Sequence, residues 1–220
     1  MNKSLQIINF GKREFSDFYK VNYRLWLQRL ANDIIDSLVF VEHPHVILVG
    51  NQGNAKEIRF PYAMTRRVEI PVYEVDWEGD ITYRGPGQLS VYPVLHLNRH
   101  GLGVEEMIGK FEQLLIHLFH QYGIKAHSIP GEKGVWVEKA RIACIDLEVR
   151  QSVTRFSLAI NVNPRLSLFR ILQPDLNTAH GVTSLYQILK KKIDLEVLKS
   201  QFVDLFQREF GFRAEDASSF

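Results

Sequence analysis

Residues Asp76–Leu97 read D-W-E-G-D-I-T-Y-R-G-P-G-Q-L-S-V-Y-P-V-L-H-L, with apolar runs on both sides of a Gly-Pro-Gly turn. The branched and aromatic residues within 72–83 and 89–95 are typical of buried strands. In the turn, Gly85 and Gly87 free the backbone and the proline between them stiffens it. The stretch therefore predicts two strands joined by a tight connection. Two roles for that connection stay open: an ordinary turn, or a place where a ligand approaches the main chain.

The composition is that of a globular domain. The chain has 220 residues, of which 45% are hydrophobic and 24% are charged. These values suit a single domain over residues 1–220 with a sizeable core. The formal net charge of +2 is too small to indicate nucleic-acid binding. We find no repeat, low-complexity run or linker that divides the chain.

Cysteine content and the length of apolar runs indicate the cell compartment in which the protein works. The single cysteine, Cys144, excludes an internal disulfide and an all-cysteine metal site, and it fits a reducing environment. Residues 1–10 lack the charged start and continuous apolar core of a signal peptide. No window approaches the roughly 18 apolar residues of a membrane span. We therefore expect a cytoplasmic protein that binds neither membrane nor nucleic acid.

Apolar periodicity predicts three helices and several strands in one α+β domain. The helices are expected over residues 16–35, 104–122 and 195–210. A hairpin is expected over 134–150, with its turn placed at 132–134. The remaining strands are expected over 5–10, 38–41, 46–50, 124–129 and 153–163.

A metal site is not predicted. His43 and His45 flank Pro44, but neither has a cysteine or acidic partner at a standard metal-ligand spacing. We expect these histidines to position other groups. The sequence predicts no metal and no cofactor.

The central stretch resembles the octanoyltransferases of lipoate biosynthesis, in which the run is typically R-G-G-x-x-T-Y-H-G-P-G-Q-L-x-x-Y-P. The chain keeps this pattern from Thr82 to Pro93, except at Arg84, where the family has histidine. Before it, Trp77 stands for the family's arginine and Glu78 for a glycine. The resemblance covers roughly residues 5 to 212.

Later segments resemble the family's K-I-A-A-I-G, H-G-x-A-L-N-V-N and P-C-G runs, each with a departure. Arg141 stands for the lysine and Asp146 for the final glycine of the first segment. Phe156 and Ser157 replace the His-Gly pair of the second segment. Asp175 replaces the cysteine of the third.

The resemblance implies the catalytic-domain fold of biotin and lipoate ligases: a mixed, mostly antiparallel sheet flanked by helices. It also implies two partners, octanoyl-acyl carrier protein and a lipoyl-domain protein. We expect a narrow apolar cavity lined by Tyr83, Gly85, Ala143, Cys144, Leu158 and Ala159, which Trp77 and Phe156 shorten or close. The substrate-binding residues that the resemblance implies are Trp77, Glu78, Gly79, Asp80, Ile81, Thr82, Tyr83, Arg84, Gly85, Cys144, Ile145, Asp146, Ser157, Leu158 and Ala159.

The catalytic positions carry the largest departures. In the family, the cysteine of P-C-G forms an acyl-thioester, and the lysine of K-I-A lowers the pKa of that cysteine. Asp175 and Arg141 occupy these two positions. A carboxylate is a poor acyl acceptor, and arginine keeps its proton, so the pair is expected to form an ion pair.

Two other residues are candidates to restore the chemistry. Cys144 is the only thiol, but in a regular strand it would point away from Arg141 unless a bulge intervenes. Lys139 has the strand parity of Arg141 and is expected to reach the same site, although no thiol accompanies it.

Two functions therefore stay open. The first is an acyltransferase that moves octanoyl from acyl carrier protein to a lysine of a lipoyl domain. The second is a non-catalytic relative that binds an acyl chain or a lipoyl domain. The related lipoate and biotin ligases use ATP, but Glu78 brings negative charge to the place where a nucleotide phosphate would need amides and cations.

Overall fold

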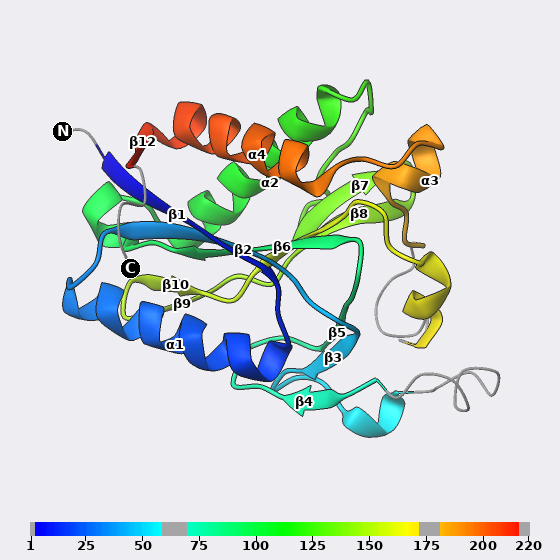
Figure 1. Cartoon of the computed structure of the whole chain (residues 1–220), viewed down its shortest axis with the longest axis horizontal. Coiled ribbons are helices and arrows are strands. Elements are labelled where there is room, and N and C mark those ends of the chain that lie inside the picture. Colours follow the sequence, from blue (N-terminus) through cyan, green and yellow to red (C-terminus); the bar gives the residue numbers. More distant parts are fainter. Residues whose placement is uncertain (1–2, 59–69, 172–180, 216–220) are drawn as a thin grey trace.

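Seven strands form the main sheet of the computed structural model, which describes residues 3–58, 70–171 and 181–215 (Figure 1). In sheet order they are β12 (Phe212–Glu215), β1 (Lys3–Lys12), β2 (Asp36–Glu42), β6 (Gln88–Val94), β11 (Leu158–Asn161), β8 (Ala140–Ile145) and β7 (Gly134–Val137). β1 runs parallel to both of its neighbours, β12 and β2. The other neighbouring pairs are antiparallel. This arrangement confirms the predicted α+β fold with a mixed, mostly antiparallel sheet.

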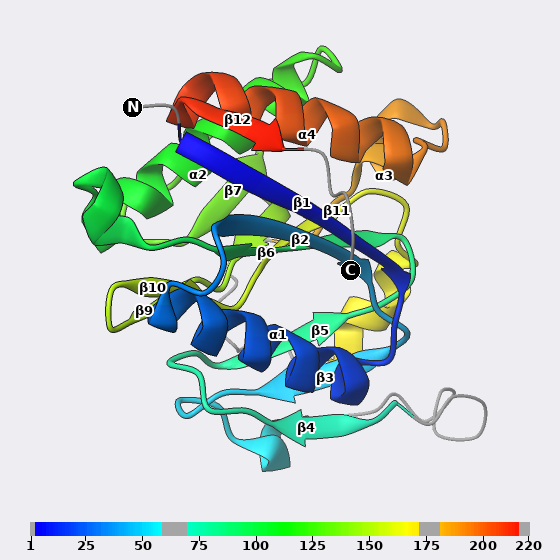
Figure 2. The ribbon, with the colours of Figure 1, turned by 60° about the vertical axis from the view of Figure 1, so that its left-hand side comes forward.

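Helices cover both faces of this sheet. α2 (Val104–His120) and α4 (Leu195–Phe210) lie on one face and close the main core together with strand residues (Figure 1). α1 (Phe15–Ala31) lies on the other face (Figure 2), where Phe18 and Trp26 belong to a second apolar cluster. The three predicted helices are confirmed, and a short fourth one, α3 (Leu185–Leu189), was missed. Within the described ranges, no helix has the length and apolar character needed to cross a membrane.

Helix α1 ends four residues earlier than predicted. Asn32 adopts the left-handed conformation (φ 64°), and the backbone after the last turn donates to the Arg29 and Gln28 carbonyls. The chain is then free to enter β2.

Two smaller sheets accompany the main one. β4 (Val72–Glu74), β3 (Val46–Val49) and β5 (Ile81–Arg84) pair in the order β4-β3-β5, and β9 (Glu148–Arg150) pairs with β10 (Val153–Arg155). Short 3₁₀ turns occur at η1 (Ala55–Glu57), η2 (Leu97–His100) and η3 (Leu166–Ile171). The Gly-Pro-Gly turn joins β5 of the small sheet to β6 of the main sheet, so the central stretch links the two sheets (Figure 2).

Three strand predictions need correction. β7 and β8 form the predicted hairpin, but its turn lies at Glu138–Lys139, where Glu138 has a φ of 53°, and not at 132–134. The expected strand over 153–163 is divided into β10 and β11, because Phe156 adopts a φ of 64° that no strand allows. The expected strand over 124–129 is reduced to an isolated bridge between His127 and Trp136.

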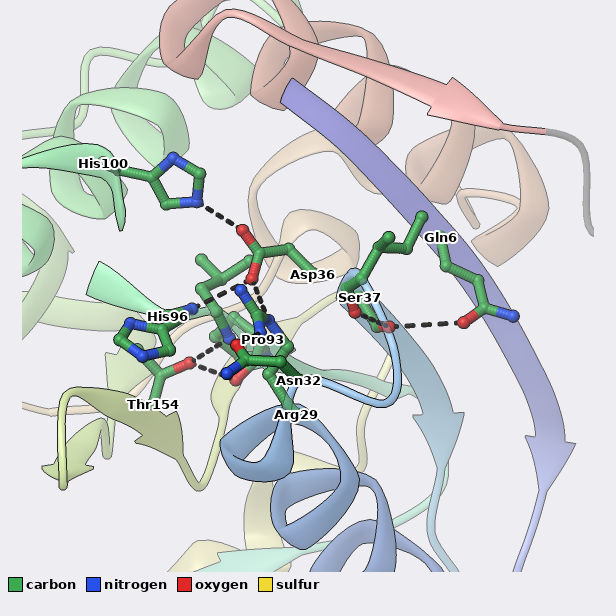
Figure 3. Close-up of polar contacts among 11 residues, drawn as sticks. Gln6, Arg29, Asn32, Asp36, Ser37, Pro93, His96, His100 and Thr154 are labelled. Carbon is green, nitrogen blue, oxygen red and sulfur yellow. Dashed lines mark hydrogen bonds and ion pairs between the residues drawn. The ribbon is translucent and has the colours of Figure 1, made fainter. Parts of the chain in front are cut away.

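The buried carboxylate of Asp36 connects the end of α1 to the sheet (Figure 3). Arg29 Nε donates to Asp36 Oδ1 at 2.6 Å, His100 Nε2 contacts the other carboxylate oxygen, and the His96 main-chain N–H donates to Oδ1 at 3.0 Å. Burial raises the pKa of Asp36, but these donors outweigh it and bring the pKa below its ordinary value of 3.8. Asp36 therefore stays ionised and holds α1, β2 and the segment after β6 together.

Candidate functional site

A cavity of about 690 Å³ opens between the residues that precede β5 and the end of β8. Its wall contains residues 77–82 from the first segment. From β8 and the turn after it come Arg141, Cys144, Ile145 and Asp146. The structure therefore brings two predicted substrate-binding segments, 77–82 and 144–146, to one cavity, although they are far apart in the sequence.

The lining of this cavity is more polar than predicted. Ala143 and Leu158, which were expected in its wall, belong to the core under α2 and α4. The large cavity is therefore not the narrow apolar cavity that the sequence predicts, whereas a smaller cavity has two of the six predicted wall residues, Tyr83 and Cys144. The charged members of the wall are Glu78, Asp80, Glu132, Lys133, Arg141 and Asp146.

A second, inner cavity of about 40 Å³ has four wall residues in common with the first. The four shared residues are Ile81, Thr82, Arg141 and Cys144. The inner wall also contains Tyr83 and Arg84, two more predicted site residues. Cys144 and Arg141 thus border both cavities.

A bulge in β8 explains how Arg141 and Cys144 reach the same cavities. Val135 of β7 pairs with Ala143 of β8, but the next residue, Trp136, pairs with Arg141. Ile142 is therefore an extra residue in β8. An extra residue reverses the alternation of side chains. Accordingly, the adjacent residues Ile142 and Ala143 both pack in the main core. β8 is therefore not a regular strand, and the exception named in the sequence analysis applies: the bulge brings Cys144 to the cavities that Arg141 lines.

The other two predicted catalytic residues are Lys139 and Asp175. Lys139 lies exposed in the turn between β7 and β8 and lines neither cavity, because β8 begins only at Ala140. Its expected approach to the site of Arg141 stays a prediction. Asp175 lies outside the described residues, so its ion pair with Arg141 stays a prediction.

The departures at Arg84 and Asp146 meet in space as an ion pair. Arg84 is 1% exposed, and its Nη2 contacts Asp146 Oδ2. Nη1 donates to Thr82 Oγ1 at 2.6 Å and to the Tyr83 carbonyl oxygen at 3.1 Å. Burial lowers the pKa of Arg84, but negative charge on Cys144, when that residue is ionised, and on Asp146 outweighs burial and raises the pKa above its ordinary value. Arginine for histidine and aspartate for glycine thus compensate each other.

Cys144 rests as a thiol. Its Sγ lies 3.4 Å from Asp146 Oδ2, to which the S–H donates. Burial raises the pKa of Cys144, and Arg84 and Arg141 offset this only in part. A nucleophilic role therefore requires that the proton leaves during the attack, and the Asp146 carboxylate is placed to receive it.

Trp77 and Phe156, two further departures, also pack on each other, with ring centroids 5.7 Å apart. Gly79 makes room for the indole, since a Cβ at Gly79 would overlap the ring. Trp77 borders the 690 Å³ cavity, whereas Phe156 lines neither it nor the inner cavity. The large cavity stays open despite both side chains.

The Gly-Pro-Gly turn is approached closely by the protein's own chain. A Cβ on Gly87, which has a φ of 85°, would lie 2.5 Å from the Asn163 carbonyl oxygen. A Cβ on Gly85 would overlap the Tyr83 hydroxyl. Neither glycine lines the two cavities, so Gly85 contributes close packing here and not a cavity wall.

The third predicted segment, 157–159, contacts the site residues Arg84 and Cys144. Ser157 Oγ accepts from Arg84 Nη2 at 3.4 Å. Ala159 is the β11 partner of Cys144, and Leu158 faces the main core. None of the three lines either cavity.

The two histidines near Pro44 contact tyrosines. His43 Nδ1 donates to the Arg13 carbonyl at 2.9 Å and its Nε2 accepts from the Tyr92 hydroxyl at 2.9 Å. Burial lowers the pKa of His43 to about 4, so this ring is neutral. His45 Nδ1 lies 2.7 Å from the Tyr83 hydroxyl. Across the described ranges, no three His, Cys, Asp or Glu side chains converge as a metal ion would need.

Sequence reasoning missed two polar residues of the inner wall, Gln88 and Asn161. Gln88 Nε2 donates to Asn161 Oδ1 at 3.0 Å, and both residues are at most 5% exposed. A polar residue at the end of a largely apolar strand was the available indication, since Gln88 begins β6 and Asn161 ends β11. Gln52 and Lys133 of the outer wall come from turns, where no pattern marks them.

Comparison with known proteins finds relatives over most of the chain. A family model described as the lipoyl protein ligase A/B catalytic domain matches residues 18–207. The octanoyltransferase of Desulforamulus reducens is 32% identical over 212 residues, which cover 96% of this chain and 93% of that protein. The octanoyltransferase of Bacteroides fragilis is 37% identical over 170 residues, covering 74% of this chain and 76% of that protein.

Solved structures share the fold at low identity. Lipoate-protein ligase A bound with ATP superposes with a TM-score of 0.72 at 12% identity, covering 98% of this chain and 89% of that one. A bi-partite lipoate protein ligase from Thermoplasma acidophilum has a TM-score of 0.70 at 12% identity, covering 100% and 88%. The match to the family model over most of the sequence is decisive: the chain belongs to the lipoyl protein ligase A/B catalytic-domain family.

Proposed function

We propose that this chain acts in protein lipoylation, moving octanoyl from acyl carrier protein to a lysine of a lipoyl domain. The observation that carries the proposal is the shared position of Cys144 and Arg141 on a cavity bounded by residues 77–82. Cys144 is the only sulfur nucleophile of the chain. The relatives named octanoyltransferases support the reaction class. The ligase from T. acidophilum, which was studied with its E2 lipoyl domain, supports a lipoyl domain as acceptor.

In the proposed reaction, Cys144 replaces the cysteine that the family has at position 175. Cys144 Sγ bonds to the octanoyl carbonyl carbon, and the bond from that carbon to the carrier's sulfur breaks. The Cys144 proton passes through Asp146, 3.4 Å away, to the departing carrier thiolate. A lysine amine of the lipoyl domain then attacks the new thioester, and its proton returns to Cys144 sulfur. The guanidinium groups of Arg84 and Arg141, which line the inner cavity together with Cys144, stabilise the charge that develops on the carbonyl oxygen.

A second candidate function is binding without transfer. Arg141 stays protonated and cannot relay protons as the family's lysine does. Burial also holds Cys144 in its less reactive form. If Asp175 and Arg141 pair as expected, the remaining charges at the family's catalytic positions neutralise each other. Such a protein would hold an acyl chain or a lipoyl domain without modifying it.

Intact-mass measurement after incubation with octanoyl-acyl carrier protein separates the two functions. Transfer through Cys144 predicts one octanoyl adduct on the wild type and none on Cys144→Ser. It also predicts octanoylation of an apo lipoyl domain by the wild type only. Retained binding of the carrier with no adduct and no transfer would favour the second function.

A transfer rate that survives Cys144→Ser would refute the thiol route and direct attention to other groups. Lys139→Ala is the matched control, because Lys139 is an exposed residue near the same strand that lines neither cavity. It should leave the adduct and the transfer unchanged.

A further inference from the structure

The inner cavity has one donor and one acceptor whose hydrogen bonds are not made. Arg84 Nε and Gln88 Oε1 are buried and have no hydrogen-bond partner among the described residues. The two side chains are 1% and 2% exposed, and both line the inner cavity. The other polar atoms of Arg84 are occupied by Thr82, Tyr83, Asp146 and Ser157. Buried polar groups in native proteins nearly always have a partner, so an unpaired donor and acceptor on one cavity point to a ligand.

The orientation of the Gln88 amide follows from its neighbour. Asn161 Nδ2 donates toward the Arg141 carbonyl at 3.5 Å, which leaves Asn161 Oδ1 to accept from Gln88 Nε2 at 3.0 Å. Gln88 Oε1 is therefore the free end of the amide. Arg84 and Gln88, two of the residues that line the inner cavity, thus have one unpaired N–H and one unpaired carbonyl oxygen between them.

We propose that the inner cavity recognises a secondary amide, whose carbonyl oxygen accepts from Arg84 Nε–H and whose N–H donates to Gln88 Oε1. The inference rests on the proposed function, because acyl transfer to a lysine produces such an amide. It adds the two side chains that bind the amide head group. While the amine attacks the acyl carbonyl, the same pair is placed to stabilise the carbonyl oxygen and to orient the amine N–H.

Other ligands of similar size match this pair less well. An ester or thioester has a carbonyl acceptor but no N–H, so Gln88 Oε1 would stay buried and unpaired. A carboxylate would place a second acceptor against Gln88 Oε1. A single water needs about 10–15 Å³, so it would fill only part of the inner cavity, which is about 40 Å³.

The test compares three probes that differ only in the head group: N-methyloctanamide, N,N-dimethyloctanamide and methyl octanoate. Their affinities for the full-length wild-type protein are measured by titration calorimetry. We expect N-methyloctanamide to bind about tenfold or more tightly than either of the others, since only it satisfies both groups. Equal affinities, or no binding of N-methyloctanamide, would overturn the proposal.

Gln88→Met removes the acceptor at similar size and should abolish the preference for the amide. Ser90→Ala is the matched control: Ser90 lies two residues further along β6, is 1% exposed and also has an unpaired oxygen, but it lines neither cavity. It should keep the preference. If Gln88→Met melts before it can be titrated, the three probes on the wild type still decide.

The two proposals fail in different ways. Equal binding of all three probes would remove the amide site but leave acyl binding and octanoyl transfer intact. Failure of transfer from octanoyl-acyl carrier protein, with the amide preference present, would remove the transferase function but leave the amide site.

Discussion

Asp146→Gly should destabilise the protein strongly, although it restores the residue typical of the family. Arg84 is 1% exposed and Asp146 is 17% exposed, so the change leaves a buried guanidinium without its counter-charge. Removing one partner of a buried pair costs about 3–5 kcal/mol. Because water reaches Asp146, we expect the lower end, about 3 kcal/mol. For a chain of this size, that corresponds to a fall in Tm of about 6–12 °C.

Arg84→His in the same background should recover much of this loss, because the unpaired charge is then gone. Urea denaturation of the wild type, both single variants and the double variant gives the coupling energy of the pair. We expect about 2–3 kcal/mol, with unchanged denaturant slopes. The backbone effect of the new glycine occurs in both the single and the double variant, so it cancels. Additivity within about 0.5 kcal/mol would refute the conclusion that the two departures compensate each other.

Three further outcomes are expected. Asp36→Asn should cost about 3 kcal/mol at pH 7. The pKa of Asp36 in the folded protein is depressed below 3.8, so the difference in unfolding free energy between wild type and variant should persist above pH 3.8 and shrink at lower pH. A constant difference in urea denaturation down to pH 3 would contradict this expectation. Gly87→Ala should lower Tm more than Gly101→Ala, since both have positive φ but only Gly87 has main-chain atoms within 4 Å of the new Cβ; equal losses would argue against that close contact. Asp175→Cys with Arg141→Lys should give more octanoylation of an apo lipoyl domain than either single change, and no gain would mean that the backbone no longer places the two residues together.

Elements with a clear period could be predicted from the sequence. The three long helices and the strands β2 and β3 match their apolar patterns, because burial on one face or on both faces leaves a period in the sequence. Helix α1 was extended too far because the left-handed turn at Asn32 follows from backbone geometry and not from an apolar period.

The site was harder to predict, because its key geometry depends on a single extra residue. Nothing in K-A-R-I-A-C-I marks Ile142 as a bulge, since each residue there is compatible with a regular strand. That one residue moves Cys144 to the cavity of Arg141. The pairing of Arg84 with Asp146 is equally invisible in sequence, because 62 positions separate them and only the fold brings them together.

The position of β1 has a consequence for how the protein folds while it is synthesised on the ribosome. β1 pairs with β2 on one side and with β12 on the other, and Lys3 also donates to the Phe210 carbonyl, 207 positions away. At about 5–20 residues per second, roughly 10–40 s pass between synthesis of the two strands. During that time the outer edge of β1 has unpaired main-chain groups, which is the kind of edge that joins foreign strands. Newly made chains should therefore depend most on chaperones just before their last segment emerges.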